Sequence, residues 1–361
     1  MSNVVEYQDL IAFHPGSYLE EIIDEWNVTQ ADFAKRIGVS SKTISKIVSG
    51  QDNVSAATAD KLAKATGISM ATWLRLQAQY DTKLAEIQDA QQIADEAQVA
   101  KLLDLKYLKN NQFIENKRYS TVEKIHVLRK LFKISSLTQL RIFDSAVSYR
   151  RSASDSEEKS IVCSNAMLNL ATNLARHATD NKYSKEKLEQ ALPKIKQMSL
   201  DSPEHFYPKL VAVLAACGIV LEALPMLPGA RLNGATKRFK NGSVLLLVTD
   251  KNRYADIFWF SLMHELGHIY YQDFHSDYED KTAYFKKEEQ ADRFASEFYV
   301  PSVKFTEFVS KHEFTRQSIS AFSRELNIDP GMLVGRLQKH ELIDYSHFNE
   351  LRTKYEMQIV G

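Results

Sequence analysis

Apolar positions in the first 80 residues form short segments with a helical period, separated by residues that start or stop helices. Thr29 can cap the helix that follows it, and Val28 and Phe33 are spaced to pack across that cap. Three glycines follow such segments, where the end of a helix favours a left-handed backbone: Gly38, Gly50 and Gly67. The pattern predicts an all-α domain of short helices over residues 1–85.

The helical pattern continues beyond Trp73 through residues 76–103 without a glycine or a proline. This stretch is rich in Ala and Gln, which favours equally a helix that connects or dimerises domains and a solvated linker helix. In residues 120–140 a further packed helix is predicted by apolar residues on one face: Val122, Ile125, Leu128 and Phe132. We expect residues 86–200 to form a helical middle region, with the polar residues 151–160 as a flexible connection.

Apolar runs become longer after a boundary that we expect near residues 198–206. Residues 210–224, "LVAVLAACGIVLEAL", predict a buried helix that leads into a strand. Residues 241–252, "NGSVLLLVTDKN", predict a turn, a short strand and a second turn. Helical patterns return at 258–272 and 286–301. We therefore predict a mainly α chain of the α+β class, in which a small sheet backs a helical domain at residues 201–361.

Composition and charge add few constraints. The 361 residues carry no net charge, so any site for a charged partner must be local. Only Cys163 and Cys217 are present, which is typical of an intracellular protein without disulfides, and Cys217 stands in an apolar run that predicts burial. The start of the chain lacks the pattern of a secretory signal, and the longest apolar run is too short to span a bilayer. We expect a cytoplasmic protein with no membrane partner.

The segment "QADFAKRIGVSSKTISKIVSG" predicts two helices that cross closely. Ala34 leaves room for the second helix, and Ile44 and Ile47 point into the shared core. The outer face of the second helix then carries short hydroxyl and basic side chains: Ser40, Ser41, Lys42, Thr43, Ser45 and Lys46. Between residues 35 and 64, six basic residues stand against two acidic ones. Such side chains bind phosphates and base edges, so this face suits DNA.

This N-terminal pattern, together with "HPGSYLEEI" and "KLAKATGISMATWLRLQAQYD", resembles the HigA-like branch of Xre/Cro-type repressor-antitoxins over roughly 85 residues. The resemblance implies a helix-turn-helix domain that binds a double-stranded DNA operator as a homodimer, with the helix from about Ser40 to Val48 in the major groove. It also implies that Gln30 contacts phosphate. Bases or backbone would be contacted by Ser41, Lys42, Thr43 and Lys46.

A second segment, residues 322–340, "FSRELNIDPGMLVGRLQKH", resembles the two-helix pattern more weakly. Phe322 and Ile328 match Phe33 and Val39 by position. However, glycines and Met332 stand where a DNA-reading helix needs polar side chains. The segment is interpreted as a pair of packing helices.

The segment "FWFSLMHELGHIYYQ", residues 258–272, contains the pattern H-E-x-x-H. On a helix, His264 and His268 lie one turn apart on one face, so both imidazoles can reach one ion. Glu265 lies about 100° around the helix, from where it can act on water as a general base. The spacing predicts a metal-dependent hydrolase.

A catalytic site of this kind needs a third protein ligand. The long metzincin form requires glycine at position 271 and histidine at position 274, where this chain has Tyr271 and Phe274. His275 is one position too late. The metzincin interpretation therefore fails, and a carboxylate from the following helix is the other option.

That helix, "KKEEQADRFASEFYVP", is stopped by Pro301. Glu288 shares one face with Asp292 and with two alanines, Ala291 and Ala295, which permit close approach to the histidine helix. Asp292 can orient a ligand histidine from behind. Glu289 is the alternative ligand, although it points about 100° away from this face.

The paired motifs resemble the ImmA/IrrE family of metallo-endopeptidases over roughly residues 200–340. The resemblance implies a gluzincin-like site in which His264, His268 and Glu288 hold Zn²⁺ and Glu265 activates water against a peptide carbonyl. Members of this family commonly cleave a repressor, which implies a protein substrate here. Four nearby residues come into consideration for stabilising the oxyanion, but packing is favoured for each: Tyr270, Tyr271, His275 and Tyr284.

Three functions are consistent with this pattern. The first is a DNA-binding regulator of antitoxin type fused to a zinc endopeptidase that cleaves itself, a partner repressor or a cognate toxin. The second is a non-catalytic, autoregulating antitoxin whose metal domain is structural or sensory. The third is an enzyme whose N-terminal face binds protein instead of DNA.

Overall fold

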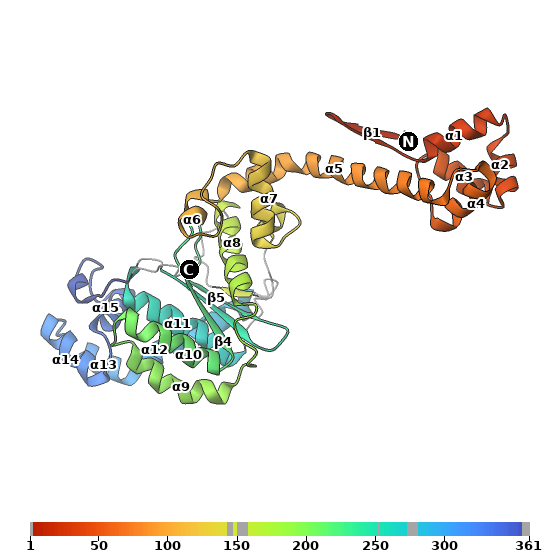
Figure 1. Cartoon of the computed structure of the whole chain (residues 1–361). Helices are drawn as coiled ribbons and strands as arrows, with labels where there is room; N and C mark the ends of the chain where they lie inside the picture. The colour runs from red at the N-terminus through yellow and green to blue at the C-terminus, as the bar shows by residue number, and fades with distance from the viewer. Residues whose placement is uncertain (1–2, 143–146, 150–157, 251–252, 273–280, 356–361) are drawn as a thin grey trace. The chain divides into compact units, whose positions relative to one another are not determined.

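The computed structural model describes residues 3–142, 147–149, 158–250, 253–272 and 281–355. The described chain is mostly helical with small sheets, as predicted (Figure 1). It forms two compact units, Met1–Glu96 and Ala97–Gly361. The predicted division into three parts at residues 85 and 200 stays a prediction. Among the described helices, none has the length and apolar character needed to cross a membrane.

The first unit begins with a hairpin of two strands, followed by helices. Its elements are β1 (Val4–Tyr7), β2 (Leu10–Phe13), α1 (Gly16–Glu25), α2 (Gln30–Ile37), α3 (Ser41–Val48), α4 (Ala56–Thr66) and α5 (Met70–Leu102), which runs on into the second unit. The hairpin corrects the expectation of an all-α domain. In its turn, Gln8 has a left-handed backbone conformation, φ 52°. The turn contains neither Gly nor Asn, the residues that usually predict a hairpin turn from sequence.

Helix ends in this unit follow the predicted chemistry. The Thr29 side chain accepts a hydrogen bond from the backbone N–H of Asp32 at 3.1 Å, and Gly38 and Gly67 end α2 and α4 with left-handed backbones. Phe33, Ile44 and Trp73 are fully buried in a shared core. These contacts fix α3 against the rest of the unit.

Helix α1 contacts α3 at a glycine. A Cβ atom on Gly16 would lie 1.9 Å from the carbonyl oxygen of Ile47, well inside van der Waals contact. The absence of a side chain at this position therefore allows α1 to pack against α3.

The second unit contains the remaining elements. They are α6 (Leu105–Asn110), α7 (Thr121–Phe132), η1 (Leu137–Arg141), β3 (Val147–Tyr149), α8 (Glu158–Ala175), α9 (Lys185–Met198), α10 (Pro203–Ala216), β4 (Ile219–Leu224), β5 (Gly234–Arg238), β6 (Val244–Thr249), α11 (Ala255–Tyr271), α12 (Lys281–Tyr299), α13 (Ser302–Ser310), α14 (Arg316–Leu326), α15 (Pro330–Lys339) and η3 (Asn349–Leu351).

The predicted elements of this unit are largely present. The predicted helix and strand at residues 210–224 are α10 and β4, with Cys217 buried between them, and the predicted short strand is β6. Helix α7 packs through Ile125, Leu128 and Phe132, but Val122 is 41% exposed, because it lies in the first turn beyond the packed surface. In the predicted connection, residues 151–157 lie outside the described residues, and α8 begins immediately afterwards.

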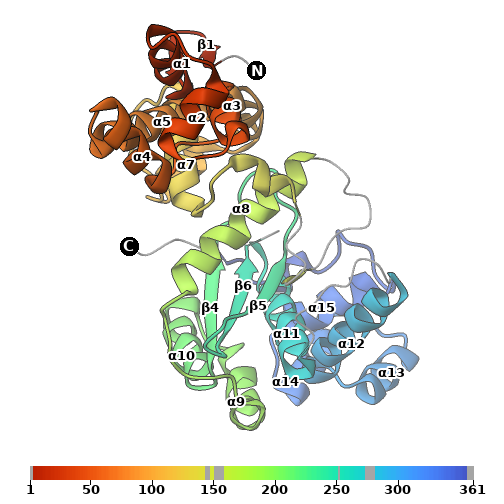
Figure 2. The ribbon, with the colours of Figure 1, turned by 90° about the vertical axis from the view of Figure 1, so that its right-hand side faces the viewer.

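The larger sheet has the strand order β3-β5-β6-β4. Strand β4 pairs parallel to β6, whereas β5 pairs antiparallel to β6 and β3 antiparallel to β5. Every residue of β6 is buried, because both faces of the sheet are covered. Helix α8 contacts β4 and β6, and α11 contacts β5 and β6 (Figure 2). The sheet therefore supports α11 directly.

Helices α14 and α15 form the predicted packing pair. Ile328, Leu333 and Val334 are buried in the same core as α11. The C-terminal residues are fixed to α11 by a buried ion pair, in which the Arg352 guanidinium donates to both carboxylate oxygens of Asp256 at 3.1 and 2.8 Å. A Cβ on Gly335 would lie 2.5 Å from that carboxylate, so the glycine leaves room for the pair.

Candidate functional site

The outer face of α3 carries the side chains that the sequence suggested for DNA. Ser40 caps the helix by accepting a hydrogen bond from the backbone N–H of Thr43 at 3.1 Å. Ser41, Lys42 and Ser45 are exposed. Thr43 and Lys46 are half-buried, and the opposite side of the helix is in the core.

Gln30 is the first residue of α2 and lies beside this face. Its side chain lines the same shallow hollow as Ser45 and Ser49 of the α3 segment. The fold thus brings Gln30 near Ser45 and Ser49, although they are separated in sequence.

The local positive charge is partly neutralised. Lys46 lies 3.4 Å from Asp52, and Lys64 lies 2.7 Å from Asp60. Lys61 donates a hydrogen bond to the carbonyl of Gly38 at 2.5 Å, which satisfies the end of α2. Three of the six basic residues therefore make local contacts. The other three are exposed: Lys35, Arg36 and Lys42.

The H-E-x-x-H pattern lies on α11, a helix that is buried along most of its length. His264, Glu265 and His268 are each 1% exposed. Buried polar groups require partners, so the surroundings of these three side chains decide what the helix can do.

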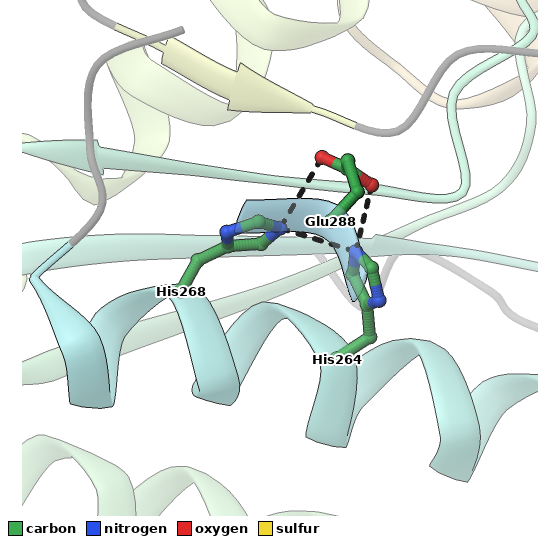
Figure 3. A group of neighbouring side chains, drawn as sticks. All are labelled: His264, His268 and Glu288. Atoms are coloured by element: carbon green, nitrogen blue, oxygen red, sulfur yellow. Dashed lines mark hydrogen bonds and ion pairs between the residues drawn. The ribbon is translucent and has the colours of Figure 1, made fainter. Parts of the chain in front are cut away.

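The two histidines and one carboxylate converge (Figure 3). The Nε2 atoms of His264 and His268 lie 3.1 Å apart. Glu288, on α12, places Oε2 at 3.3 Å from Nε2 of His264 and Oε1 at 3.5 Å from Nε2 of His268. Glu289 is exposed and is not a member of this cluster.

The cluster fits a divalent cation. For an ion that holds its ligands at about 2.0–2.1 Å in a tetrahedron, neighbouring ligand atoms lie about 3.3–3.4 Å apart. The distance between the two Nε2 atoms and the distance from each to its nearer carboxylate oxygen, 3.1 to 3.5 Å, are close to this value. The Oε1 atom of Glu288 is buried and has no hydrogen-bond partner among the described residues. Two imidazoles and a carboxylate are also the ligands that zinc prefers.

The contacts within the cluster favour a protonated His264 beside an ionised Glu288. Burial lowers the pKa of His264, but its hydrogen bonds to Asp292 and Glu288 outweigh burial and raise the pKa to about 9. Burial raises the pKa of Glu288, but the two histidines outweigh it and lower the pKa to about 2. A cation would therefore displace a proton from His264, whereas Glu288 is already ionised.

Asp292, one turn after Glu288 on α12, lies behind His264. Its Oδ1 atom accepts a hydrogen bond from Nδ1 of His264 at 2.8 Å, so Nε2 is left to face the cluster. Oδ2 of the same carboxylate accepts from Lys339 of α15 at 3.1 Å. No sequence pattern indicated Lys339, because the contact joins residues that are 47 positions apart.

Two glycines that the sequence patterns did not single out leave room for groups of the site. Gly267 of α11 faces Ala291 of α12, and a Cβ on this glycine would lie 3.1 Å from the Cα of Ala291. Gly234 of β5 faces Glu265, and a Cβ there would lie 2.6 Å from Cγ of the glutamate. The glycine inside "HELGH" was the available signal for the first contact. No local signal marks the second.

The residues considered for an oxyanion do not converge on the cluster within the described part of the chain. The Tyr270 hydroxyl donates to Glu189 at 2.9 Å, and Lys185 lies over the Tyr270 ring. Tyr271 is 40% exposed. His275 and the side chain of Tyr284 lie outside the described residues.

Comparisons with known proteins match the two ends of the chain separately. A helix-turn-helix family model matches residues 19–73, and an IrrE N-terminal-like domain of a peptidase family matches residues 230–337. Virulence-associated protein I of Dichelobacter nodosus is 37% identical over 86 residues, which cover 24% of this chain and 79% of that protein. Virulence-associated protein A' of the same organism is 34% identical over 87 residues, covering 24% and 72%.

Two solved structures match the same N-terminal part. A putative antidote protein of a plasmid maintenance system from Nostoc punctiforme is 31% identical, covers 23% of this chain and 92% of its own, and gives a TM-score of 0.23. An addiction module antidote protein of a HigA family from Coxiella burnetii is 31% identical, covers 23% and 91%, and gives a TM-score of 0.22. Through its N-terminal unit this chain belongs to the helix-turn-helix family, and its second unit carries an IrrE N-terminal-like domain of a metallopeptidase family.

Proposed function

We propose that this chain is a DNA-binding transcriptional regulator of antitoxin type whose second unit is a zinc-dependent endopeptidase that cleaves a regulatory protein. The observation that carries the peptidase half is the convergence of His264, His268 and Glu288, with Glu265 on the same helix. The observation that carries the DNA-binding half is the exposed polar face of α3 in a helix-turn-helix unit.

In this proposal the two histidines and Glu288 hold Zn²⁺, and Asp292 holds His264 with Nε2 toward the ion. Bound zinc would polarise a peptide carbonyl and make water a stronger acid. Glu265 takes a proton from water as the water oxygen bonds to the carbonyl carbon. It then delivers this proton to the amide nitrogen as the C–N bond breaks, which gives a carboxylate and a free amine.

In the DNA-binding half, Gln30 and Ser40 contact phosphate, and Ser41, Lys42, Thr43 and Lys46 contact bases or backbone of a double-stranded operator. A homodimer supplies two such helices, because a two-fold operator presents two half-sites about one helical turn apart. The regulatory protein that is cleaved is a partner repressor, a cognate toxin or the chain itself.

One observation favours a second function. His264, Glu265 and His268 are almost completely buried, and a site that admits substrate is usually more open. A non-catalytic antitoxin whose zinc is structural or sensory would account for this burial. The two functions differ in whether any peptide bond is cut.

Zinc content and cleavage test the peptidase half together. We expect about one zinc per chain in the purified wild-type protein and in Glu265→Gln, measured by elemental analysis, and no zinc in Glu288→Gln. Glu289→Gln is the matched control and should keep its zinc. Candidate regulators are incubated with each protein and followed by intact mass. Cleavage by the wild type alone supports the peptidase, whereas bound zinc without cleavage supports the second function.

Gel shift on the DNA upstream of the gene tests the other half. DNA binding should weaken steeply as the salt concentration rises. Lys42→Ala should weaken it further and reduce the slope of log K against log salt concentration by about one. Lys64→Ala is the control, because Lys64 is paired with Asp60 on α4. Equal binding by wild type and Lys42→Ala at every salt concentration would remove α3 as the recognition helix.

A further inference from the structure

The edge of β5 that faces away from β6 is occupied by a short strand of the same chain. Strand β3 pairs antiparallel with β5, with Val147 opposite Lys237, Ser148 opposite Thr236 and Tyr149 opposite Ala235. Since β6 covers the other edge of β5, β3 supplies the remaining backbone partners of this strand within the described chain.

Strand β5 packs against the candidate general base. Gly234 precedes the paired residues of β5, and a Cβ on it would lie 2.6 to 2.9 Å from three atoms of the Glu265 side chain. Tyr149 is paired one residue further along, at Ala235. In the view of Figure 3, the strand in the colour of β3 runs above the three labelled side chains, on the side of Glu288.

A peptide bond is presented to such a site by an extended backbone. An extended segment that leaves water needs partners for its N–H and C=O groups, and the edge of a sheet provides them by strand addition. The strand that packs against Glu265 is β5, and its edge can pair with one strand at a time.

We propose that β3 is an intramolecular occupant of the peptide-binding edge of β5, and that a substrate segment must displace it. This inference rests on the proposed peptidase and names how that site takes its substrate: as an extended strand added antiparallel to β5.

Competition of this kind lowers the apparent affinity for any peptide. A tethered segment has an effective concentration in about the millimolar range, and the apparent dissociation constant rises as the fraction of open edge falls. Weakening β3 should therefore strengthen peptide binding without any change in the residues that bind the peptide.

The experiment measures binding, not cleavage. Full-length Glu265→Gln, loaded with zinc, is titrated into a fluorescent peptide of residues 143–152, "FDSAVSYRRS", and followed by anisotropy. The same titration is made with Ser148→Pro added, because proline has no N–H to donate and its ring holds φ near −65°, away from the extended geometry of a paired strand. Ser154→Pro, in the polar segment that follows, is the control. A triple change of residues 147–149 to glycine replaces the proline variant if the latter does not fold.

We expect Ser148→Pro to lower the dissociation constant at least tenfold, and Ser154→Pro to leave it within twofold. Equal constants in all three proteins would overturn the inference. So would cutting of the zinc-loaded wild-type chain within residues 143–157, seen by intact mass, because β3 would then be a substrate and not an inhibitor. Failure of the peptidase proposal itself would appear as missing zinc or missing cleavage, and the binding comparison is independent of cleavage.

Discussion

The close crossing of α11 and α12 is predicted to control zinc affinity. Gly267 and Ala291 face each other there, and even a single methyl group on Gly267 would lie 3.1 to 3.4 Å from Ala291 and Phe294. Leucine in place of Ala291, which is 1% exposed, has no space at this crossing and must push α12 away from α11. Overpacking of this kind lowers the free energy of unfolding by about 1–3 kcal/mol.

The same displacement moves Glu288, one turn earlier on α12, away from the histidines. Its oxygens already lie 3.3 and 3.5 Å from the two Nε2 atoms. If the shift of α12 makes the free energy of zinc binding less favourable by about 1.4–2.8 kcal/mol, the dissociation constant for zinc rises about 10- to 100-fold. Ala291→Leu should therefore lose zinc to a chromophoric chelator that the wild type resists.

The control is Gln290→Leu, which adds the same side chain at an exposed neighbouring position. Its zinc affinity should stay within about threefold of the wild type, since nothing packs tightly there. Far-UV circular dichroism and thermal melting establish that both variants fold. If folded Ala291→Leu held zinc as tightly as Gln290→Leu, the argument that small residues bring Glu288 to the histidines would be wrong.

Three further predictions concern stability and DNA binding. Burial raises the pKa of Glu222 from 4.5 to about 7. Between these two values the folded state keeps a proton that the unfolded state loses. The contribution of Glu222 to the free energy of unfolding is therefore largest below about pH 4.5 and falls until about pH 7. Glu222→Gln should abolish this fall, which is at most about 3 kcal/mol, in melting curves across that range. Gly16→Ala should destabilise the first unit by about 1–3 kcal/mol in urea and weaken operator binding in gel shifts, because the added Cβ meets the Ile47 carbonyl. Arg352→Met should destabilise the second unit by about 3–5 kcal/mol, since it leaves Asp256 buried and unpaired, and Asp256→Asn with Arg352→Met should recover part of this loss.

Local chemistry in the sequence predicted much of the fold. Thr29 and Gly38 mark the ends of α2, because capping depends on residues within one helical turn. The apolar runs predicted α10, β4 and β6 for the same reason. The hairpin of β1 and β2 was missed, since its turn at Gln8 lacks the residues that usually signal a left-handed backbone.

For the cluster of His264, His268 and Glu288, the spacing of the two histidines was enough to place them on one face, because four residues make about one turn of any α-helix. From the sequence, Glu288 and Glu289 remained alternatives. Only the tertiary structure brought Glu288 to the two Nε2 atoms and Asp292 to Nδ1 of His264, because the crossing of α11 and α12 depends on side-chain volumes in both helices. It likewise decided that Lys339 reaches Asp292 and that Gly234 makes room for Glu265, since such contacts join residues that no periodicity relates.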